Sequence, residues 1–179
     1  KSQIKKMRDK FDKTGKLLAH DILLPRGNDK ASPAYQKACD KMAELVNAHQ
    51  INTLAVGNGS GCKEAYELID ECIDSQRFNG NVTKLTVNEA GASVYSTATV
   101  AIEEFPELDA TIRSAISIAR RAQDPLAELV KIEPRSVGVG QYQHDCNVAK
   151  MNDTLKEVVQ SCVNRVGVNT NTASYKLLE

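Results

Sequence analysis

The sequence predicts an α/β fold in which helices cover a mixed or parallel sheet. Short apolar runs rich in Val, Ile and Leu alternate with segments whose apolar residues recur every three or four positions. The hydrophobic fraction of 41% is sufficient for a core, although aromatic residues make up only 4% of the chain. No apolar run approaches the ~20 residues that a membrane-spanning helix needs. The last part of the chain has a helical pattern alone, which predicts a C-terminal α-helical extension.

The N-terminal residues are basic. Residues 1–11 place apolar side chains only at Ile4, Met7 and Phe11, so we expect a short basic helix or an exposed arm that contacts phosphates. Residues 1–16 hold seven Lys/Arg and two Asp, a net charge of +5, whereas the whole chain is neutral. Neutrality does not favour an electrostatically driven nucleic-acid binder, so that role would need local basic patches or neighbouring domains.

A strand and then the clearest amphipathic helix come next. The strand is expected over residues 16–24, which read KLLAHDILL. Ser32, followed by proline, is typical of a helix start, because serine caps free N–H groups and proline fits the first turn. The helical pattern extends to His49, which lies on the apolar stripe, and there a packed histidine is more usual than a metal ligand.

A glycine-rich turn separates the next strand and helix. Residues 51–56 predict a compact strand and residues 63–74 predict a helix, and the turn between them contains Gly57, Asn58 and Gly59. Free backbone N–H groups in such a turn are able to hold a phosphate. The spacing fits neither common nucleotide-binding loop, so a tight turn without a ligand is the simpler interpretation.

Glu89 follows the strand predicted over residues 82–87. Open α/β sheets place their sites at the carboxyl ends of strands, so this carboxylate is a candidate for metal binding or acid–base chemistry. The alternative is a polar loop residue that caps the next helix.

Two helices with acidic and basic features follow. One is expected over residues 93–105 and the other over residues 110–123, with Asp109 as its N-cap. Arg113 and Arg120 are seven residues apart, so they share one face of the second helix, and Arg121 is next to them. Arginine on a helix face grips phosphates through its planar donor fork, although a solvated face is the common alternative.

Asp124, followed by proline, predicts that a new helix begins. Its buried face is expected to consist of Leu126, Leu129 and Val130, with Glu128 near the positive end of the helix dipole.

Residues 137–140 then predict a short strand with two glycines. Tyr142 and His144, flanked by amide side chains, are able to stack on a nucleobase, or they dock the linker onto the sheet domain. The candidate nucleic-acid-binding residues are Arg113, Arg120, Arg121, Lys131, Tyr142 and His144.

The C-terminal part is predicted to be helical. A helix is expected to begin at Asn152 or Asp153, to carry an apolar stripe, and to end at Gly167. Residues 169–179 begin a further helical segment.

The five cysteines are scattered, and no two form a CxxC pair. Cys39, Cys72 and Cys162 occupy apolar positions of helical patterns, so we expect reduced, buried thiols in a cytoplasmic or nuclear protein. The HDC tripeptide at residues 144–146 has no second cluster to complete a zinc site, so no metal and no cofactor are expected.

Four longer runs occur in a fixed order: NEAGASVYS (88–96), IRSAISIARRAQDPLAELVKIEP (112–134), SVGVGQYQHD (136–145) and CVNRVGVNTNTAS (162–174). These runs resemble the Tex family of bacterial transcription accessory proteins and their eukaryotic relatives. The resemblance extends from about Asp12 to the C-terminus. It implies a YqgF-homologous domain with a ribonuclease H-like fold over residues 1–134 and a connector over 135–151. Residues 152–179 would begin a helix-hairpin-helix region, and an RNA-binding domain would follow in the parent chain.

The resemblance also implies a function. It points to a nucleic-acid-binding domain, for RNA or DNA, of a transcription-associated protein. Nuclease relatives have an aspartate in the first strand and an acid on the last helix. The first-strand aspartate is missing from this sequence, and the position of the last-helix acid falls near Arg113. Glu89 is therefore a vestigial candidate, and we expect no enzyme activity. A metal-dependent nuclease or resolvase stays an alternative, as does a protein-interaction scaffold in a transcription complex. The expected partners are RNA or DNA, transcription machinery and the rest of the parent chain, with no membrane.

Overall fold

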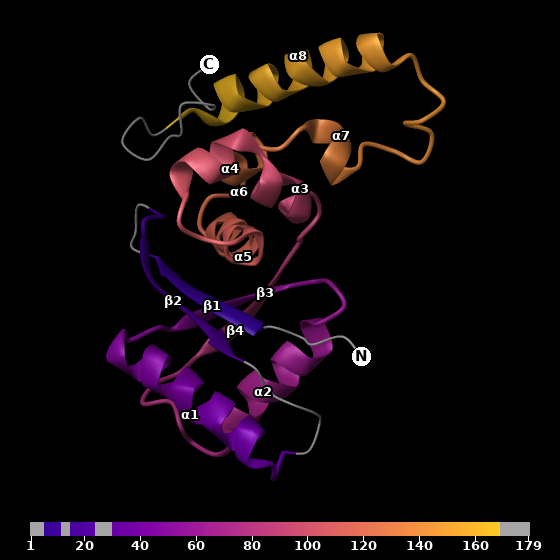
Figure 1. The fold of residues 1–179 in the computed structure, drawn as a ribbon. Helices are drawn as coiled ribbons and strands as arrows, with labels where there is room; N and C mark the ends of the chain where they lie inside the picture. The colour runs from indigo at the N-terminus through magenta and orange to yellow at the C-terminus, as the bar shows by residue number, and fades with distance from the viewer. Residues whose placement is uncertain (1–5, 12–14, 24–29, 169–179) are drawn as a thin grey trace. The chain divides into compact units, whose positions relative to one another are not determined.

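The computed structural model describes residues 6–11, 15–23 and 30–168. These residues form two compact units, one from the described parts of 6–10 and 17–89, and the other from 11, 15–16 and 90–168. The elements are shown in Figure 1. In chain order they are β1 (Lys6–Phe11), β2 (Leu17–Leu23), α1 (Pro33–Ala48), β3 (Thr53–Gly57), α2 (Cys62–Asp74), β4 (Thr83–Val87), α3 (Ala92–Thr97), α4 (Thr99–Glu104), α5 (Ala110–Arg121), α6 (Pro125–Leu129), α7 (Pro134–Val137) and α8 (Val148–Val166).

The core of the first unit lies between α1, α2 and the strands β2 and β3. The Ser32 hydroxyl accepts a hydrogen bond from the Tyr35 N–H at 3.3 Å, which confirms the predicted start of α1. The amphipathic pattern of α1 then buries one stripe against α2. The buried side chains of this core are Leu23, Tyr35, Ala38, Cys39, Met42, Val46, Leu54, Val56, Leu68, Ile69 and Cys72.

Strands β3 and β4 form a parallel pair. Their register runs from Thr53 opposite Thr83 to Gly57 opposite Val87. Because both strands end at the same level, the glycine-rich turn after β3 and the Asn88–Glu89 segment after β4 lie at one edge of the pair. The residues before the strands, 51–52 and 79–82, lie at the opposite edge.

The second unit is built from short helices around α5. Asp109 caps α5 by accepting a hydrogen bond from the Ile112 N–H at 2.9 Å, as predicted. Ile112 and Ile116 are buried, and α3 packs against α5. Tyr95, Ala101 and Ile132 form a second apolar cluster that joins α3 and α4 to the segment after α6.

The strand β1 corrects the expectation of a basic helix or an exposed arm at residues 6–11. Its sequence, KMRDKF, has a poor strand pattern, but β1 is hydrogen-bonded to β2 in a two-stranded sheet. Pairing with a neighbouring strand depends on context, and it overrides weak local preference.

The helix expected over residues 93–105 is two helices. Ala98 has an extended backbone (φ −71°, ψ 150°) and separates α3 from α4. Just before it, the hydroxyls of Ser96 and Thr97 donate to the carbonyls of Ser93 and Val94, at 2.7 and 3.1 Å. Such side chain–backbone bonds compete with the helical ladder and explain the break.

The prediction of a strand over residues 137–140 is wrong. Pro134 instead occupies the first turn of the short helix α7, a position for which its fixed φ is suited. The helix α8 begins earlier than predicted, because Asn147 accepts a hydrogen bond from the Lys150 N–H at 3.1 Å. It ends at Gly167, with φ of 81°, as predicted. Residues 169–179, where a further helix was expected, lie outside the described residues.

Two further findings correct the sequence-based expectations. The described strands form two two-stranded sheets, β1–β2 and β3–β4, where a single mixed sheet was expected, because the alternation of elements does not dictate which strands pair. Cys39 and Cys72 are buried as expected, whereas Cys162 is exposed because α8 buries none of its residues. None of the described helices is long and apolar enough to cross a bilayer.

Candidate nucleic-acid interface

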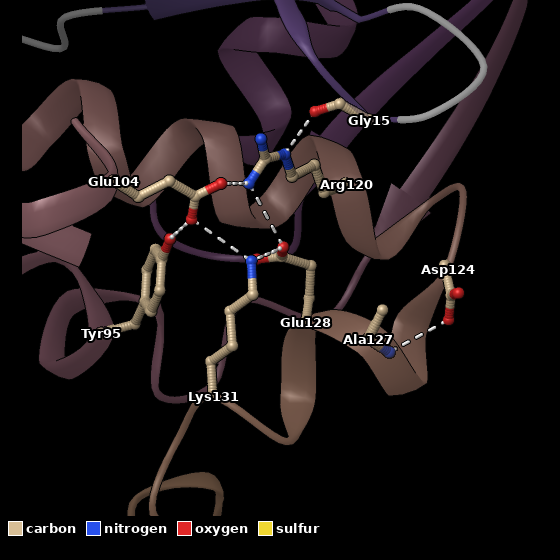
Figure 2. A network of polar contacts seen from close by, with 8 residues as sticks. All are labelled: Gly15, Tyr95, Glu104, Arg120, Asp124, Ala127, Glu128 and Lys131. Atoms are coloured by element: carbon tan, nitrogen blue, oxygen red, sulfur yellow. Dashed lines mark hydrogen bonds and ion pairs between the residues drawn. The ribbon is translucent and has the colours of Figure 1, made fainter. Parts of the chain in front are cut away.

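Four charged side chains of the second unit form a closed ionic network (Figure 2). Arg120 Nη1 lies 2.6 Å from Glu104 Oε1 and 3.6 Å from Glu128 Oε1. Lys131 Nζ lies 2.6 Å from Glu128 Oε1 and 3.4 Å from Glu104 Oε2. Each cation therefore contacts both anions. The side chains of Lys131 and Glu128 are only 5% and 4% exposed, and burial of such charges is tolerable because they are paired.

The short helix α6 positions the Glu128 side chain in this network. Asp124 accepts a hydrogen bond from the Ala127 N–H at 3.0 Å, which fixes the first turn. Lys131 lies in the turn just after α6, where its N–H donates to the Glu128 carbonyl at 3.2 Å and its side chain reaches the Glu128 carboxylate. The prediction that Leu126, Leu129 and Val130 form the buried face is corrected, since these three are half-buried and Glu128 is buried. The ionic partners on other segments, which no local pattern reveals, explain the difference.

Aromatic rings close the network on two sides. The Tyr95 hydroxyl donates to Glu104 Oε2 at 3.2 Å. Lys131 Nζ lies 5.9 Å from the centre of the Tyr95 ring, and the Arg120 guanidinium lies 5.1 Å from that of Phe105. Burial, together with the carboxylates of Glu128 and Glu104, raises the pKa of the Tyr95 phenol far above its usual range, so this hydroxyl stays a donor.

The pKa of Glu104 is lowered by its partners. Burial alone would raise the pKa of this carboxyl, but the charges of Lys131 and Arg120 outweigh that effect and hold the pKa below its usual range. Arg120 also donates through Nε to the Gly15 carbonyl at 2.6 Å. The network therefore ties Gly15 to α5 and α4 within the second unit.

The other two arginines of α5 also bind the protein itself. Arg113 donates to the Ser96 carbonyl at 2.7 Å and to the carbonyls of Phe105 and Leu108. Arg121 is only 6% exposed and donates to the Ala90 carbonyl at 2.8 Å. The geometry gives Arg113, Arg120, Arg121 and Lys131 a structural role, and contact of these side chains with nucleic acid stays a prediction.

Tyr142 and His144 lie on the surface of the second unit. The Tyr142 side chain is exposed, at 67%, and His144 is also exposed. The segment that carries them has its own hydrogen bonds. Gln143 Oε1 accepts from the Val139 N–H at 3.0 Å, and the Tyr142 carbonyl accepts from the Asp145 N–H at 3.0 Å and from Cys146 Sγ at 3.3 Å. The turn is thus braced from within while its tyrosine faces solvent.

The glycine-rich turn and Glu89 meet in the first unit. The Asn58 N–H donates to the Val87 carbonyl, and the Glu89 N–H donates to Asn58 Oδ1, both at 3.0 Å. A Cβ atom at Gly59 would fall 1.7 Å from Glu89 Oε1, so glycine leaves the space that this carboxylate occupies. The predicted phosphate loop, Gly57 to Gly59, therefore faces a negative charge, which repels a phosphate.

Metal-binding side chains do not gather in the part of the chain that the structure describes. Within it, no group of three or more His, Cys, Asp and Glu residues has the geometry to hold a metal ion. Glu89 therefore belongs to no such group of three among these residues, whereas a two-metal site needs several carboxylates.

Comparison with known proteins decides the family. The model of the Tex protein YqgF-like domain matches residues 9–123, more than half of the chain. The chain belongs to the Tex family. YhgF of Escherichia coli is 48% identical over 169 residues, which cover 93% of this chain and 21% of YhgF. The transcriptional accessory protein Tex of Neisseria gonorrhoeae is 45% identical over 168 residues, covering 93% of this chain and 21% of that protein.

A human relative is matched over a smaller share of both chains. The human S1 RNA-binding domain-containing protein 1 is 45% identical over 143 residues, which cover 79% of this chain and 14% of that protein. The Tex-family chain described here thus spans about a fifth or less of these relatives' length.

The ionic network and its partners were missed by the sequence analysis. The spacing of Glu128 and Lys131 was a usable signal, because oppositely charged residues three positions apart pair on a helix. Nothing in the sequence marks Glu104 as their common partner, and the backbone carbonyls that bind Arg113 and Arg121 leave no trace in the residue types.

Proposed function

We propose that this Tex-family chain is a nucleic-acid-binding domain that contacts single-stranded RNA or DNA by base stacking and has no nuclease activity. The observation that carries the proposal is the outward-facing Tyr142, 67% exposed on an internally braced turn, with His144 beside it. Aromatic side chains presented in this way stack on unpaired bases of any sequence. Two relatives have names that refer to transcription and to RNA binding, which supports the same class of ligand.

The protein contacts of the four cationic candidates favour stacking over phosphate binding by those side chains. The chain is neutral, and Arg113, Arg120, Arg121 and Lys131 all bind groups of the protein. Affinity that arises from phosphate contacts requires cations that face the ligand. The aromatic face of Tyr142 does not depend on such cations, because every base has a π-face.

We expect no catalysis, because the described residues provide too few metal ligands near Glu89. Two-metal cleavage of a phosphodiester needs several carboxylates that hold two ions about 4 Å apart. Glu89 belongs to no group of three potential metal ligands among the described residues. We infer that the domain has the ribonuclease H-like fold that a YqgF-like domain implies, as a relic of a nuclease, and that it acts beside transcription machinery and the other domains of a longer chain.

Fluorescence anisotropy with labelled single-stranded RNA and DNA tests the stacking role. Tyr142→Ala is expected to weaken binding by about five- to 150-fold, the range for loss of one stacked base. Tyr142→Phe is the matched control, because it keeps the ring and removes only the hydroxyl, and it should bind like the wild type. Equal affinity of Tyr142→Ala and the wild type would contradict the proposal.

The same samples test the alternative of a nuclease. They are incubated with Mg²⁺ or Mn²⁺, and the products are separated on a gel. We expect no cleavage. Metal-dependent cleavage that Glu89→Gln abolishes would favour the nuclease instead.

A second candidate function is a scaffold, favoured by the helix α8. This 19-residue helix buries none of its residues, and Val148, Val158 and Val166 are 46%, 51% and 72% exposed. The relatives' much greater length supplies a specific occupant, namely the other segments of the parent chain. Under this proposal α8 docks onto those segments, and Tyr142→Ala leaves nucleic-acid affinity unchanged.

A further inference from the structure

A cavity of about 420 Å³ opens at the edge of the β3–β4 pair opposite Glu89. Its walls are the end of α1, the residues just before β3 and those before β4, all within the first unit. Five of its eight lining residues carry a side-chain amide, and none is charged. Val46 and Ile51 supply the apolar part. This volume lies in the range of small-molecule sites, which combine apolar walls with a few polar groups.

One wall of the cavity is held together by the half-buried Asn47. Its Nδ2 donates to the Arg77 carbonyl, and its Oδ1 accepts from the Asn79 N–H, both at 2.8 Å. The Thr83 N–H also donates to the Asn52 carbonyl at 2.8 Å. These bonds fix the segment before β4 against the end of α1. Asn47 is therefore a positioning residue, with both ends of its amide already engaged.

The amides that remain for a ligand belong to residues on the rim. Gln50, Asn79 and Asn81 are exposed, and in the described part of the chain no hydrogen bond engages their side-chain amides. Each side-chain amide offers two donor hydrogens and one acceptor oxygen. The rim thus presents paired donors and acceptors above an apolar floor.

Gln50 occupies a backbone conformation that usually selects glycine. Its φ is 50°, and it closes α1 through hydrogen bonds from Ile51 N–H to the Val46 carbonyl (2.9 Å) and from its own N–H to the Asn47 carbonyl (3.3 Å). Helices commonly end in this way with glycine, which adopts positive φ without strain. This conformation sets the direction in which the Gln50 side chain leaves the end of α1, beside the cavity.

We propose that this cavity accepts an unpaired nucleobase, with adenine favoured, from a single strand. The amide of asparagine or glutamine pairs bidentately with the N6 and N7 groups of adenine. The half-buried Ile51 offers apolar contact to the ring, and the uncharged lining favours a neutral group over a phosphate or carboxylate. The inference rests on the proposed function, because the base belongs to the strand that the domain binds.

The chain contains a matched control for Gln50. Gln76 has φ of 53° and closes α2 by the same pair of bonds, from Arg77 N–H to the Cys72 carbonyl (3.0 Å) and from Gln76 N–H to the Ile73 carbonyl (2.9 Å). It does not line the cavity. Replacement of either glutamine by glycine relieves the same backbone strain, so both variants should fold and should raise the urea midpoint.

The test compares labelled oligoadenylate and oligouridylate of equal length by fluorescence anisotropy. The wild type should prefer oligoadenylate by about tenfold, within the range expected for one bidentate base contact. Gln50→Gly should abolish this preference, and Gln76→Gly should keep it. Equal affinity of the wild type for both strands, or a preference retained in Gln50→Gly, would overturn the cavity proposal while the proposed function stands.

Adenosine separates failure of the cavity from failure of the proposed function. In ¹H–¹⁵N NMR spectra, adenosine should shift the side-chain amide signals of Gln50, Asn79 and Asn81 and leave that of Gln76 in place. If no strand binds at all, the proposed function is wrong, and the adenosine titration alone then decides on the cavity. The absence of such shifts would reject it.

Discussion

Glu104 joins both cations of the ionic network, and its position has a consequence for pH dependence. Its carboxylate pairs with Arg120 and Lys131, and its side chain is 32% exposed. Partners that stabilise the charged form lower the folded-state pKa below the unfolded-state value. The carboxylate therefore stabilises the fold above the unfolded-state pKa, and this contribution is lost as the pH falls through the lower, folded-state pKa.

The first prediction concerns Glu104→Gln. At pH 7 this variant should lose about 1–2 kcal/mol of unfolding free energy, a value reduced for the partial exposure of the side chain. The difference from the wild type should shrink below about pH 4.3, the usual value for an unfolded glutamate. Urea unfolding, monitored by circular dichroism at several pH values, measures this difference in unfolding free energy. Glu103→Gln, at an exposed position of the same helix, is the control, and a difference that stays constant down to pH 3 would contradict the prediction.

Gly59 shows the limit of inference from residue type. Its glycine was expected either to hold a phosphate or to form a tight turn, and the structure instead places the Glu89 carboxylate where a Cβ would lie. The two residues are 30 positions apart, and only the parallel pairing of β3 with β4 brings them together. Sequence reasoning found both residues but not their contact.

The helix α6 is small enough for its cap to matter. It spans five residues, too few for a helix to be stable by itself, and it carries Glu128 into the ionic network. Asp124 accepts the hydrogen bond that fixes its first turn. The chain thus depends on a single cap to position a buried carboxylate.

Replacement of this cap gives the second prediction. Asp124→Ala should lower the unfolding free energy by about 1 kcal/mol, the usual loss when a helix cap is removed. Asp124→Asn keeps an oxygen that accepts the Ala127 N–H and should retain most of the stability. Thermal unfolding of both variants and the wild type measures the difference. Equal loss in Asp124→Asn and Asp124→Ala would mean that the charge, and not the cap, is important.

Local sequence signals predicted where helices begin. They failed where the structure of a segment depends on residues or strands that contact it. Ser32, Asp109 and Asp124 all cap helices as their sequence context indicates, because a cap and its N–H group are only three residues apart. The strand β1 was missed because its pairing with β2 is what makes it a strand. The break at Ala98 was missed because alanine itself favours helix, and neighbouring hydroxyls cause the break.

At the scale of the whole molecule, the zero net charge and the protein contacts of the four cationic candidates both point to binding by base stacking. The four cationic candidates of the second unit contact carboxylates or carbonyls of the protein. The other two candidates, Tyr142 and His144, are exposed to solvent. Salt weakens the phosphate contacts of a protein far more than it weakens stacking, so the salt dependence of binding separates the two contributions.

The last prediction follows from this separation. Tyr142→Ala should lower affinity for single-stranded RNA by the same factor at 50 mM and 200 mM salt, so that plots of log affinity against log salt for variant and wild type are parallel. Loss of one phosphate contact would instead make the slope shallower by about 0.7. Anisotropy titrations at four salt concentrations measure both slopes. A shallower slope for Tyr142→Ala would place this side chain among the groups that organise phosphate contacts. Parallel lines would identify Tyr142 as a stacking contact that is independent of the contacts between cations of the chain and phosphates of the strand.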